Sequence, residues 1–240
     1  MFISNEQVAN RILLALPPEV LKELKPQLRL VELRKGLTIS RKGEPITTHY
    51  FINRGVVSLL KRMEDGRAVE IGVMGIEALT TPELLLGVNA PLFEAMVHVP
   101  GTGFAISRAR LKDFFQETHR LSAVVLAYVH AAASQIAQTA ACNRLHPLER
   151  RVSRWLLVAH DSARSDRFAL THEFLAEMLG VQRPRISVCM KKMQDAGLLD
   201  YFRGQLTIID RARLELQSCE CYRTITGEFN KIFDRHLQHA

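Results

Sequence analysis

The stretch of sequence that decides the fold runs Leu170-Thr-His-Glu-Phe-Leu-Ala-Glu-Met-Leu-Gly-Val-Gln-Arg-Pro-Arg-Ile-Ser-Val-Cys-Met-Lys-Lys-Met193. Thr171 is suited to cap a first helix, because its hydroxyl can accept a hydrogen bond from a free N–H group of the first turn. Apolar residues then recur on one face at helical spacing. Gly180 follows where the chain must turn, since a positive φ costs glycine little. A second amphipathic helix comes next, so the pattern predicts a helix-turn-helix.

The second helix carries positive charge on the face opposite its apolar residues. There is no Asp or Glu between Gln182 and Gln194. Arginines at the start of a helix in the major groove can bind guanine edges bidentately, and lysines further along can contact phosphates. A solvated face on an ordinary core helix is the alternative. We expect double-stranded DNA to be the partner, and the candidate contact residues are Thr171, Gln182, Arg183, Arg185, Ser187, Lys191 and Arg203.

The elements around this motif fit a winged helix. Leu148–His160 reads as a preceding helix with one apolar side, and His146-Pro147 separates it from the helix before. Gly197–Gly204 and Gln205–Ile209 are expected to form a hairpin that turns at Arg203-Gly204, which places Arg203 at the tip of the wing. The pattern does not place residues 218–240.

The first half of the chain has a different sequence pattern, with short runs of strand-forming residues separated by glycines. Glu64-Asp-Gly66 has the chemistry of a hairpin turn. Strands at this spacing predict an antiparallel sandwich or roll, with short helices at Glu19–Lys25 and 109–117. The expected strands are Leu28–Leu33, Leu37–Lys42, His49–Ile52, Val56–Lys61, Ala68–Gly72, Ala95–Val99 and Gly103–Ser107.

A long helix is expected over Leu121–Asn143, which contains no Asp, Glu, Lys or Arg. It is long enough to span a bilayer, but its many polar groups favour a helix that faces protein on two sides. One apolar row follows coiled-coil spacing, which predicts a homodimer; burial inside one monomer is the alternative. The predicted dimer seam is Leu126, Val129, Ala133, Ile136 and Ala140, and the second row is Leu121, Val125, Tyr128 and Ala132.

The composition describes a soluble globular protein: 47% of the 240 residues are hydrophobic and the net charge is +7. The start of the sequence lacks the pattern of a secretory signal, so we expect a cytoplasmic protein with no membrane partner. The four cysteines suit a reducing compartment. Cys219-Glu-Cys221 is too closely spaced for an ordinary disulfide. Metal binding or redox sensing there is an alternative to a structural role, but without a nearby second pair we predict no metal site.

These features together resemble the Crp/Fnr family of bacterial transcription regulators. The most specific motifs are Glu149-Arg-Arg-Val-Ser-Arg-Trp-Leu156, the helix-turn-helix and Ala196-Gly-Leu-Leu199. The resemblance implies an α+β fold with a cyclic-nucleotide-binding-like β-roll (1–119), a dimerisation helix and hinge (120–146) and a C-terminal winged helix-turn-helix (147–240). It also implies a homodimer on a near-palindromic site, with RNA polymerase as a further partner.

The resemblance assigns roles within the recognition helix. Arg183 matches the guanine-reading arginine of the family, Thr171 an N-cap that touches a phosphate, and Lys191 a lysine that contacts the DNA backbone. The next family position usually carries a base-reading glutamate, and here it is Pro184. The operator is therefore expected to differ from that of the cyclic-AMP receptor, with Arg185 taking over part of the readout.

The effector motif of the family is altered. Its cyclic-nucleotide sensors hold the phosphate with a Gly-Glu-Leu run and an Arg-Ser/Thr-Ala run. Here the corresponding runs are Gly75-Ile-Glu77-Ala-Leu79 and Leu92-Phe93-Glu94-Ala95-Met96. A phenylalanine replaces the arginine and an acid stands beside it, so cyclic AMP is not expected to bind. The candidate effector pocket is Gly75, Glu77, Phe93, Glu94 and Ala95, and the effector itself is unknown.

The sequence also bears on other sensing chemistries and other classes of function. A family-type iron–sulfur sensor is not expected, because no cysteine precedes Cys142; haem binding through His98 or His130 stays open. The sequence has no Gly-x-Gly-x-x-Gly, P-loop, His-Glu-x-x-His or nucleophile elbow, so we expect no enzyme. The alternative to a DNA-binding regulator is a sensory or adaptor module whose winged helix contacts protein.

Overall fold

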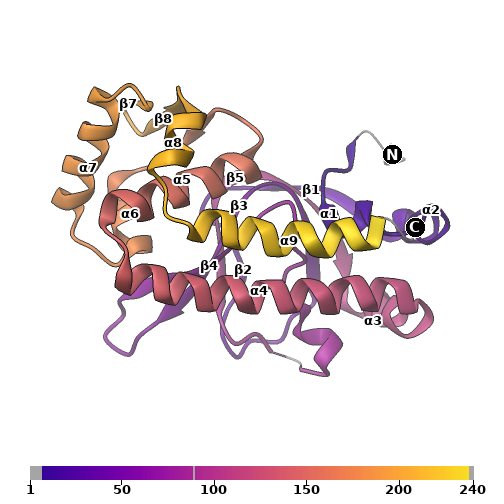
Figure 1. The fold of residues 1–240 in the computed structure, drawn as a ribbon. Helices are drawn as coiled ribbons and strands as arrows, with labels where there is room; N and C mark the ends of the chain where they lie inside the picture. The colour runs from indigo at the N-terminus through magenta and orange to yellow at the C-terminus, as the bar shows by residue number, and fades with distance from the viewer. Residues whose placement is uncertain (1–6, 89, 238–240) are drawn as a thin grey trace.

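A computed structural model describes residues 7–88 and 90–237 (Figure 1). The expectation about a secretory signal rests on residues 1–6 and lies outside this part. A β-roll lies along one side of the long helix α4 (His119–Leu145), and a winged helix-turn-helix lies at the C-terminal end of α4. This is the α+β architecture that the sequence predicted.

The β-roll is a five-stranded antiparallel sheet with the order β1-β5-β3-β4, and β2 also pairs with β5. Its turn at Gly66 joins β3 to β4, as the sequence predicted, with a backbone hydrogen bond from Met63 N–H to Arg67 O. The strands are β1 (Arg29–Leu33), β2 (Thr38–Ser40), β3 (Thr48–Arg62), β4 (Ala68–Met74) and β5 (Glu94–Ser107).

The expected division into short strands is wrong at two places. His49–Ile52 and Val56–Lys61 belong to the single strand β3, and Ala95–Val99 and Gly103–Ser107 belong to β5. The register of β3 against β5 shifts between Ile52 and Val57, so both strands bend there without ending. Glycines at the bend allow the backbones of β3 and β5 to approach closely. A Cβ on Gly55, whose φ is +99°, would lie 2.6 Å from the carbonyl oxygen of Val99.

Short helices cover the end of the roll. Pro17-Pro18 opens α2 (Pro18–Leu24), close to the expected Glu19–Lys25, and the expected helix at 109–117 is α3 (Arg108–Glu117). The side chain of Asn10 fastens this region to the sheet, since its amide donates to the carbonyl oxygens of Ile52 and Ala78 at 2.8 and 2.9 Å. The remaining short helices are α1 (Arg11–Leu14), η2 (Lys25–Gln27) and η3 (Pro82–Leu86).

Helix α4 buries one of its two predicted apolar rows. Leu121, Val125 and Tyr128 pack into the core of the β-roll, with exposed fractions of 3% or less. The predicted dimer seam is divided: Leu126, Ala133 and Ala140 are exposed, whereas Val129 and Ile136 are half-buried. Ile136 lies over Gly72 of β4. The exposed row of α4 is therefore turned slightly from the predicted seam.

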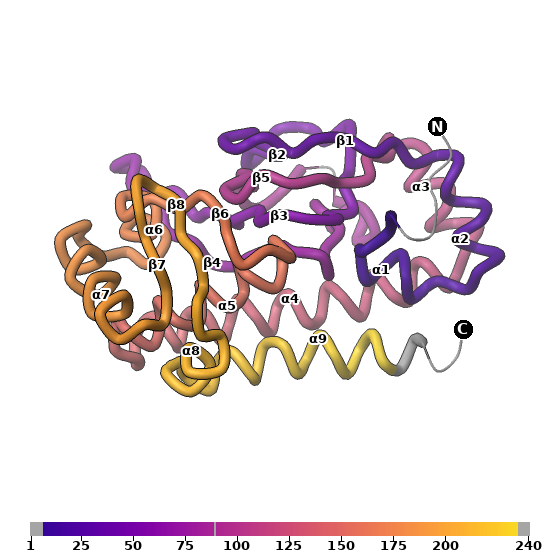
Figure 2. Tube along the Cα trace, turned by 90° about the horizontal axis from the view of Figure 1, so that it is seen from above, coloured from indigo at the N-terminus to yellow at the C-terminus, as the bar shows by residue number. Residues whose placement is uncertain are grey.

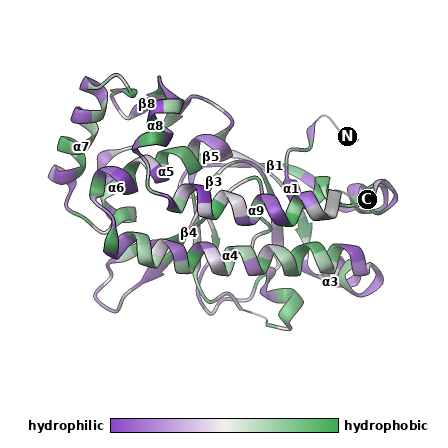
Figure 3. Ribbon diagram, in the orientation of Figure 1, coloured by the Kyte–Doolittle hydropathy of each residue, from purple (hydrophilic) through white to green (hydrophobic). Residues whose placement is uncertain are grey.

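By length and composition, α4 is the one helix among the described residues that could cross a membrane, and a third of its most apolar window is buried. Figure 3 shows its apolar middle beside the roll. The core helix of a soluble protein can have the same length and apolar composition. One row of α4 is buried in the core of the β-roll, and the helix contacts β4 and α9.

The winged helix-turn-helix packs around a second core, which includes Trp155, Leu175 and Ile186. This core also takes in Val56, Val73 and Val99 of the β-roll. The wing is the predicted hairpin with its two-residue turn at Arg203-Gly204, and both residues have positive φ, as a type I′ turn requires. A short strand that the sequence did not reveal pairs with β8. The elements are α5 (Leu148–Ala163), β6 (Arg167–Ala169), α6 (His172–Leu179), α7 (Arg183–Asp195), β7 (Leu199–Phe202), β8 (Gln205–Ile208) and α8 (Arg211–Gln217).

The region that the sequence could not place contains α9 (Cys221–Leu237). This helix returns antiparallel along α4, and Figure 2 shows the two side by side. Ile225, Phe229 and Phe233 join the core of the β-roll, and the Phe229 ring stacks on Tyr128 at 6.2 Å. The last helix thus packs with the first half of the chain, although it follows the winged helix in sequence.

Candidate nucleic-acid interface

The helix-turn-helix is fixed at each end of its first helix, α6. Thr171 is the N-cap, and its hydroxyl accepts a hydrogen bond from Phe174 N–H at 3.2 Å. Gly180 ends the helix in the left-handed conformation with φ +62°. Gln182 occupies the N-cap position of α7 without a side-chain capping bond, and Pro184 lies in its first turn, where no intrahelical N–H is needed. These details confirm the predicted motif.

Helix α7 separates its apolar and basic residues cleanly. Ile186, Cys189, Met190 and Met193 are at most 1% exposed and pack into the second core. Arg183, Arg185, Lys191 and Lys192 are exposed on the other side. The first acid in α7 is Asp195, its last residue. The helix therefore presents a basic surface over its whole length except the C-terminal end.

Three of the basic side chains of α7, Arg183, Lys191 and Lys192, form exposed ion pairs. Arg183 Nε lies 3.6 Å from Glu173, and Lys191 Nζ lies 2.5 Å from Asp195. Exposed pairs of this kind contribute little to stability, so phosphates can compete for the cations. Ser187 differs from the other candidates: its half-buried hydroxyl lies 3.0 Å from His172 Nδ1 and 3.3 Å from the carbonyl oxygen of Arg183.

The wing lies beside the same surface. The His172 ring stacks on Tyr201 of β7 at 4.4 Å, which ties the wing to the helix-turn-helix. Arg203 at the tip is exposed and lies over the Phe202 ring at 5.1 Å. Thr171, Gln182, Arg183, Arg185 and Lys191 thus belong to the helix-turn-helix proper, and Arg203 extends the surface from the wing.

A buried contact joins the two units, and sequence reasoning missed it. Glu70 of β4 is 3% exposed and accepts hydrogen bonds from Trp155 Nε1 at 2.9 Å and from Ser58 Oγ at 2.5 Å. Burial raises the pKa of Glu70 to about 7, against the effect of these hydrogen bonds, which favour the ionised form. The available signal was an acid within the apolar strand Ala68–Gly72, and its partner is 85 residues away.

A second contact across the same junction involves His98 of β5. Its ring lies 4.0 Å from that of Phe174 in α6, and its Nδ1 is buried without a hydrogen-bond partner among the described residues. Burial lowers the pKa of His98 to about 4. His98 is therefore a packed side chain in this junction, while His130 is exposed on α4. Neither placement supports the haem alternative.

The register of the β-roll sheet separates Glu94 from Glu77, two of the five predicted effector residues. Leu60 of β3 pairs with Glu94 of β5 on one side and with Glu70 of β4 on the other, so Glu94 and Glu70 lie at the same level of the sheet. Glu77 comes seven residues after Glu70, a separation of up to roughly 20 Å in an extended chain. Glu94 forms an ion pair with Arg62 at 3.2 Å. Matching short runs of sequence does not fix the register of those runs across the sheet. Phe93 is half-buried at the start of β5, and Ala95 is buried in the core.

Glu77 instead lines a cavity of about 300 Å³ among the roll, α4, α5 and α9. Its carboxylate accepts a hydrogen bond from Gly75 N–H at 2.9 Å, and burial raises its pKa. Gly75 is required here, because a Cβ would lie 2.0 Å from Ser162 Oγ. The cavity walls include Arg11, Gln135 and the α9 residues Tyr222, Ile225, Thr226, Phe229 and Asn230.

This geometry defines a class of protein: a β-roll joined by one long helix to a winged helix-turn-helix. Residues 150–216 match the family model of the Crp-like helix-turn-helix domain. No curated protein sequence matches the chain.

Solved structures share the whole architecture at low identity. FixK2 of Bradyrhizobium japonicum is 16% identical with a TM-score of 0.65, over 80% of this chain and 98% of that one. The c-di-GMP-responsive regulator CLP of Xanthomonas campestris is 17% identical with a TM-score of 0.63, over 80% and 99%. A CRP-family transcriptional regulator of Thermus thermophilus is 19% identical with a TM-score of 0.63, over 78% and 96%. The chain thus carries a Crp-like helix-turn-helix on the fold of Crp/Fnr-family transcription regulators, which confirms the resemblance seen in the sequence.

Proposed function

We propose that this chain is a dimeric transcription regulator of the Crp/Fnr type that binds specific sequences in double-stranded DNA and is not an enzyme. The observation that carries the proposal is the exposed basic face of α7. Arg183, Arg185 and Lys191 lie on it while the opposite face is buried in the second core. A recognition helix in the major groove needs this separation, because base edges and phosphates meet one side only.

The competing function is an adaptor whose winged helix contacts protein. To distinguish the two, the purified full chain is incubated with fragmented genomic DNA and the bound fragments are sequenced. A regulator should enrich a near-palindromic motif whose half-sites are about one helical turn apart. Retention of fragments without a shared motif, or of none, would favour the adaptor.

Dimerisation through α4 is part of the proposal. The exposed row at Leu126, Ala133 and Ala140 has no partner among the described residues of a single chain, and small side chains let two helices approach closely. Ile136 and Val129 are half-buried against the chain's own roll, so we infer that they border the interface.

Substituting Ala133 by glutamate should dissociate the dimer, because it would place an unpaired carboxylate in an apolar helix interface. Light scattering at micromolar concentration should report a dimer for the unmodified chain and a monomer for Ala133→Glu. The matched control is Ala196→Glu, an equally exposed position outside α4, which should remain dimeric. A monomeric unmodified chain would contradict the proposal.

We further propose that cyclic AMP is not the effector. The cavity beside Glu77 contains a second acid, Asp161, and one cation, Arg11, so an added phosphate would gain little there. Phe93 and Glu94 stand where the family has its phosphate-binding arginine run, and they lie on the roll away from Glu77. Glu94 forms an ion pair with Arg62. The c-di-GMP-responsive regulator CLP shares the fold, so the fold is compatible with other effectors.

Titration calorimetry should detect no binding of cyclic AMP or cyclic GMP at micromolar concentrations. Phe93→Arg, which restores the arginine of the family motif, should not create binding, because position 93 is separated from Glu77 across the sheet. A micromolar or tighter constant for the unmodified chain would overturn the proposal. A constant that appears only in Phe93→Arg would instead show that the two runs do share a pocket.

The proposal also includes RNA polymerase as a further partner, a cytoplasmic location and no membrane partner. The first two follow from the proposed role at promoters. The assignment of α4 to an interface between subunits accounts for its apolar character without a bilayer.

A further inference from the structure

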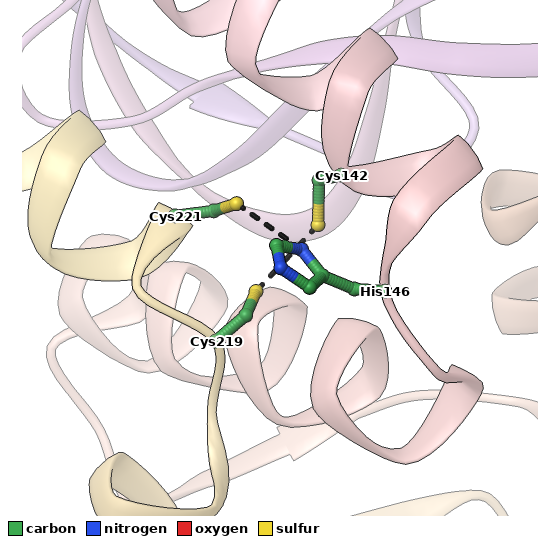
Figure 4. Close-up of side chains that lie close together, drawn as sticks. All are labelled: Cys142, His146, Cys219 and Cys221. Carbon is green, nitrogen blue, oxygen red and sulfur yellow. Dashed lines mark hydrogen bonds between the residues drawn. The ribbon is translucent and has the colours of Figure 1, made fainter.

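Four potential metal ligands come together where α4 ends and α9 begins (Figure 4). They are Cys142, His146, Cys219 and Cys221, and all of their ligand atoms lie within 4.8 Å of one another. The three cysteines are buried, and they form a small cluster separate from the two hydrophobic cores. Buried thiols can pack as small apolar side chains, but three thiols beside an imidazole are also the ligand set of a structural zinc site.

Two of the distances between ligand atoms are close to those around one tetrahedral ion. Cys142 Sγ and Cys219 Sγ are 3.6 Å apart, and Cys221 Sγ is 3.4 Å from His146 Nδ1. Around a zinc ion with Zn–S near 2.3 Å and Zn–N near 2.0 Å, these pairs are expected at about 3.8 and 3.6 Å. An iron–sulfur cluster holds its cysteines further apart, because several metal atoms lie between them. A Cys142–Cys219 disulfide would leave Cys221 and His146 without a role.

The local sequence places the ligands without strain. Cys142 lies in the last turn of α4, and His146 is the C-cap residue four positions later, with its backbone N–H bonded to the carbonyl oxygen of Cys142. Cys219 lies in the connection from α8, and Cys221 is the first residue of α9. No metal site was predicted from the sequence, because no second pair of ligands is close to Cys219-Glu-Cys221 along the chain. The fold supplies that pair from 77 residues earlier in the chain.

Neighbouring side chains interact with two of the four ligands, as outer-shell residues do in metal sites. His146 directs Nδ1 toward Cys221 and its Nε2 lies 3.2 Å from Glu220 Oε1, the carboxylate partner that commonly orients a ligating histidine. Gln138 Nε2 donates to Cys221 Sγ at 3.0 Å. The first of these features would orient the imidazole for coordination, and the second would orient the thiolate.

The charge near the cluster also favours a bound cation with thiolates. Zn²⁺ with three thiolates and a neutral histidine carries a net charge of −1. Arg154 is 3% exposed, and its Nε has no hydrogen-bond partner among the described residues. Arg154 lies near enough to Cys142 for its positive charge to act on that side chain. A buried arginine would therefore balance the charge of the complex.

We propose that Cys142, His146, Cys219 and Cys221 bind one Zn²⁺ ion, which fastens the start of α9 to the end of α4. All four positions in a tetrahedral site are filled by protein, so the site is structural and leaves no position for substrate. The ion would lie at the junction of α4 and α5, between the β-roll and the winged helix-turn-helix. It therefore sets the path by which the chain returns from α8 to the first core.

The test uses the full chain purified without chelators, with its metal content measured by mass spectrometry. We expect about one zinc per chain, and Co²⁺ replacement should give the visible bands of a tetrahedral thiolate complex. Cys221→Ala should lose the metal. Cys189→Ala, which removes an equally buried cysteine from α7, should retain it. Glu220→Gln should weaken zinc binding by about tenfold, the smaller end of the range for an outer-shell partner.

A second measurement uses the unmodified chain, so its result does not depend on whether a variant folds. Stripping zinc from the unmodified chain should speed tryptic cleavage at Arg223, in the first turn of α9, and adding Zn²⁺ should reverse the effect. Thiol titration in denaturant should find all four cysteines reduced. A chain that holds no metal and does not take up Co²⁺, one with two titratable thiols, or one with iron and inorganic sulfide would each overturn the proposal.

Discussion

Substituting Trp155 by alanine should lower the free energy of unfolding by roughly 3–5 kcal/mol. Trp155 is 1% exposed in the second core, and it also donates the hydrogen bond to Glu70 that joins the two units. The substitution removes a large apolar side chain and leaves a buried carboxyl with Ser58 as its remaining side-chain hydrogen-bond donor. Urea unfolding should be followed by circular dichroism, because Trp155 is the only tryptophan of the chain.

Two further variants separate packing from hydrogen bonding. Trp155→Phe retains most of the apolar surface but removes the N–H donor, so it should cost about 1–3 kcal/mol. Glu70→Gln keeps an acceptor for Trp155 and gains a donor for Ser58, so it should be nearly neutral. Leu216→Ala, at a position 86% exposed on α8, is the control and should change stability by less than about 0.5 kcal/mol. A loss below about 1 kcal/mol for Trp155→Ala would contradict the expected role of this tryptophan.

The features that the sequence predicted correctly depend on neighbouring residues. Thr171 and Gly180 mark the ends of α6 by local backbone chemistry, and Arg203-Gly204 defines the wing by the positive φ of a tight turn. Such signals act within a few residues, so they can be read from the chain alone. The helix-turn-helix, the wing and the buried row of α4 were predicted for this reason.

The features that were missed depend on distant partners. Asn53-Arg-Gly55 was taken as a break between two strands, but the close approach of Gly55 to Val99 makes it a bend inside one strand. The buried position of Glu70 follows from Trp155, and the grouping of Cys142 with Cys219 follows from the return of α9. Neither local spacing nor composition contains these distances, which arise only when the two units and the last helix pack together.

The division of labour along α7 gives the largest expected effect on DNA binding. Arg183 is the first residue of the helix, and Lys191 lies eight residues later, about 12 Å along its axis. In the proposed complex the helix enters the major groove by its N-terminus. Arg183 should therefore reach a base edge, and Lys191 should meet a phosphate where the helix leaves the groove.

Arg183→Ala should relax sequence preference at one symmetric pair of operator positions, since each bidentate arginine–guanine pair discriminates by ~1–3 kcal/mol. Lys191→Ala should instead weaken specific and non-specific DNA about equally, and reduce the salt slope by ~1 for each phosphate that a subunit no longer neutralises. Lys231→Ala, an exposed lysine on α9, is the charge-matched control and should change neither property. Binding-site selection and salt titrations on the three variants measure both effects. If Arg183→Ala selects the same sequence as the unmodified protein, α7 does not read DNA from its N-terminus, and the register proposed for the helix in the groove is wrong.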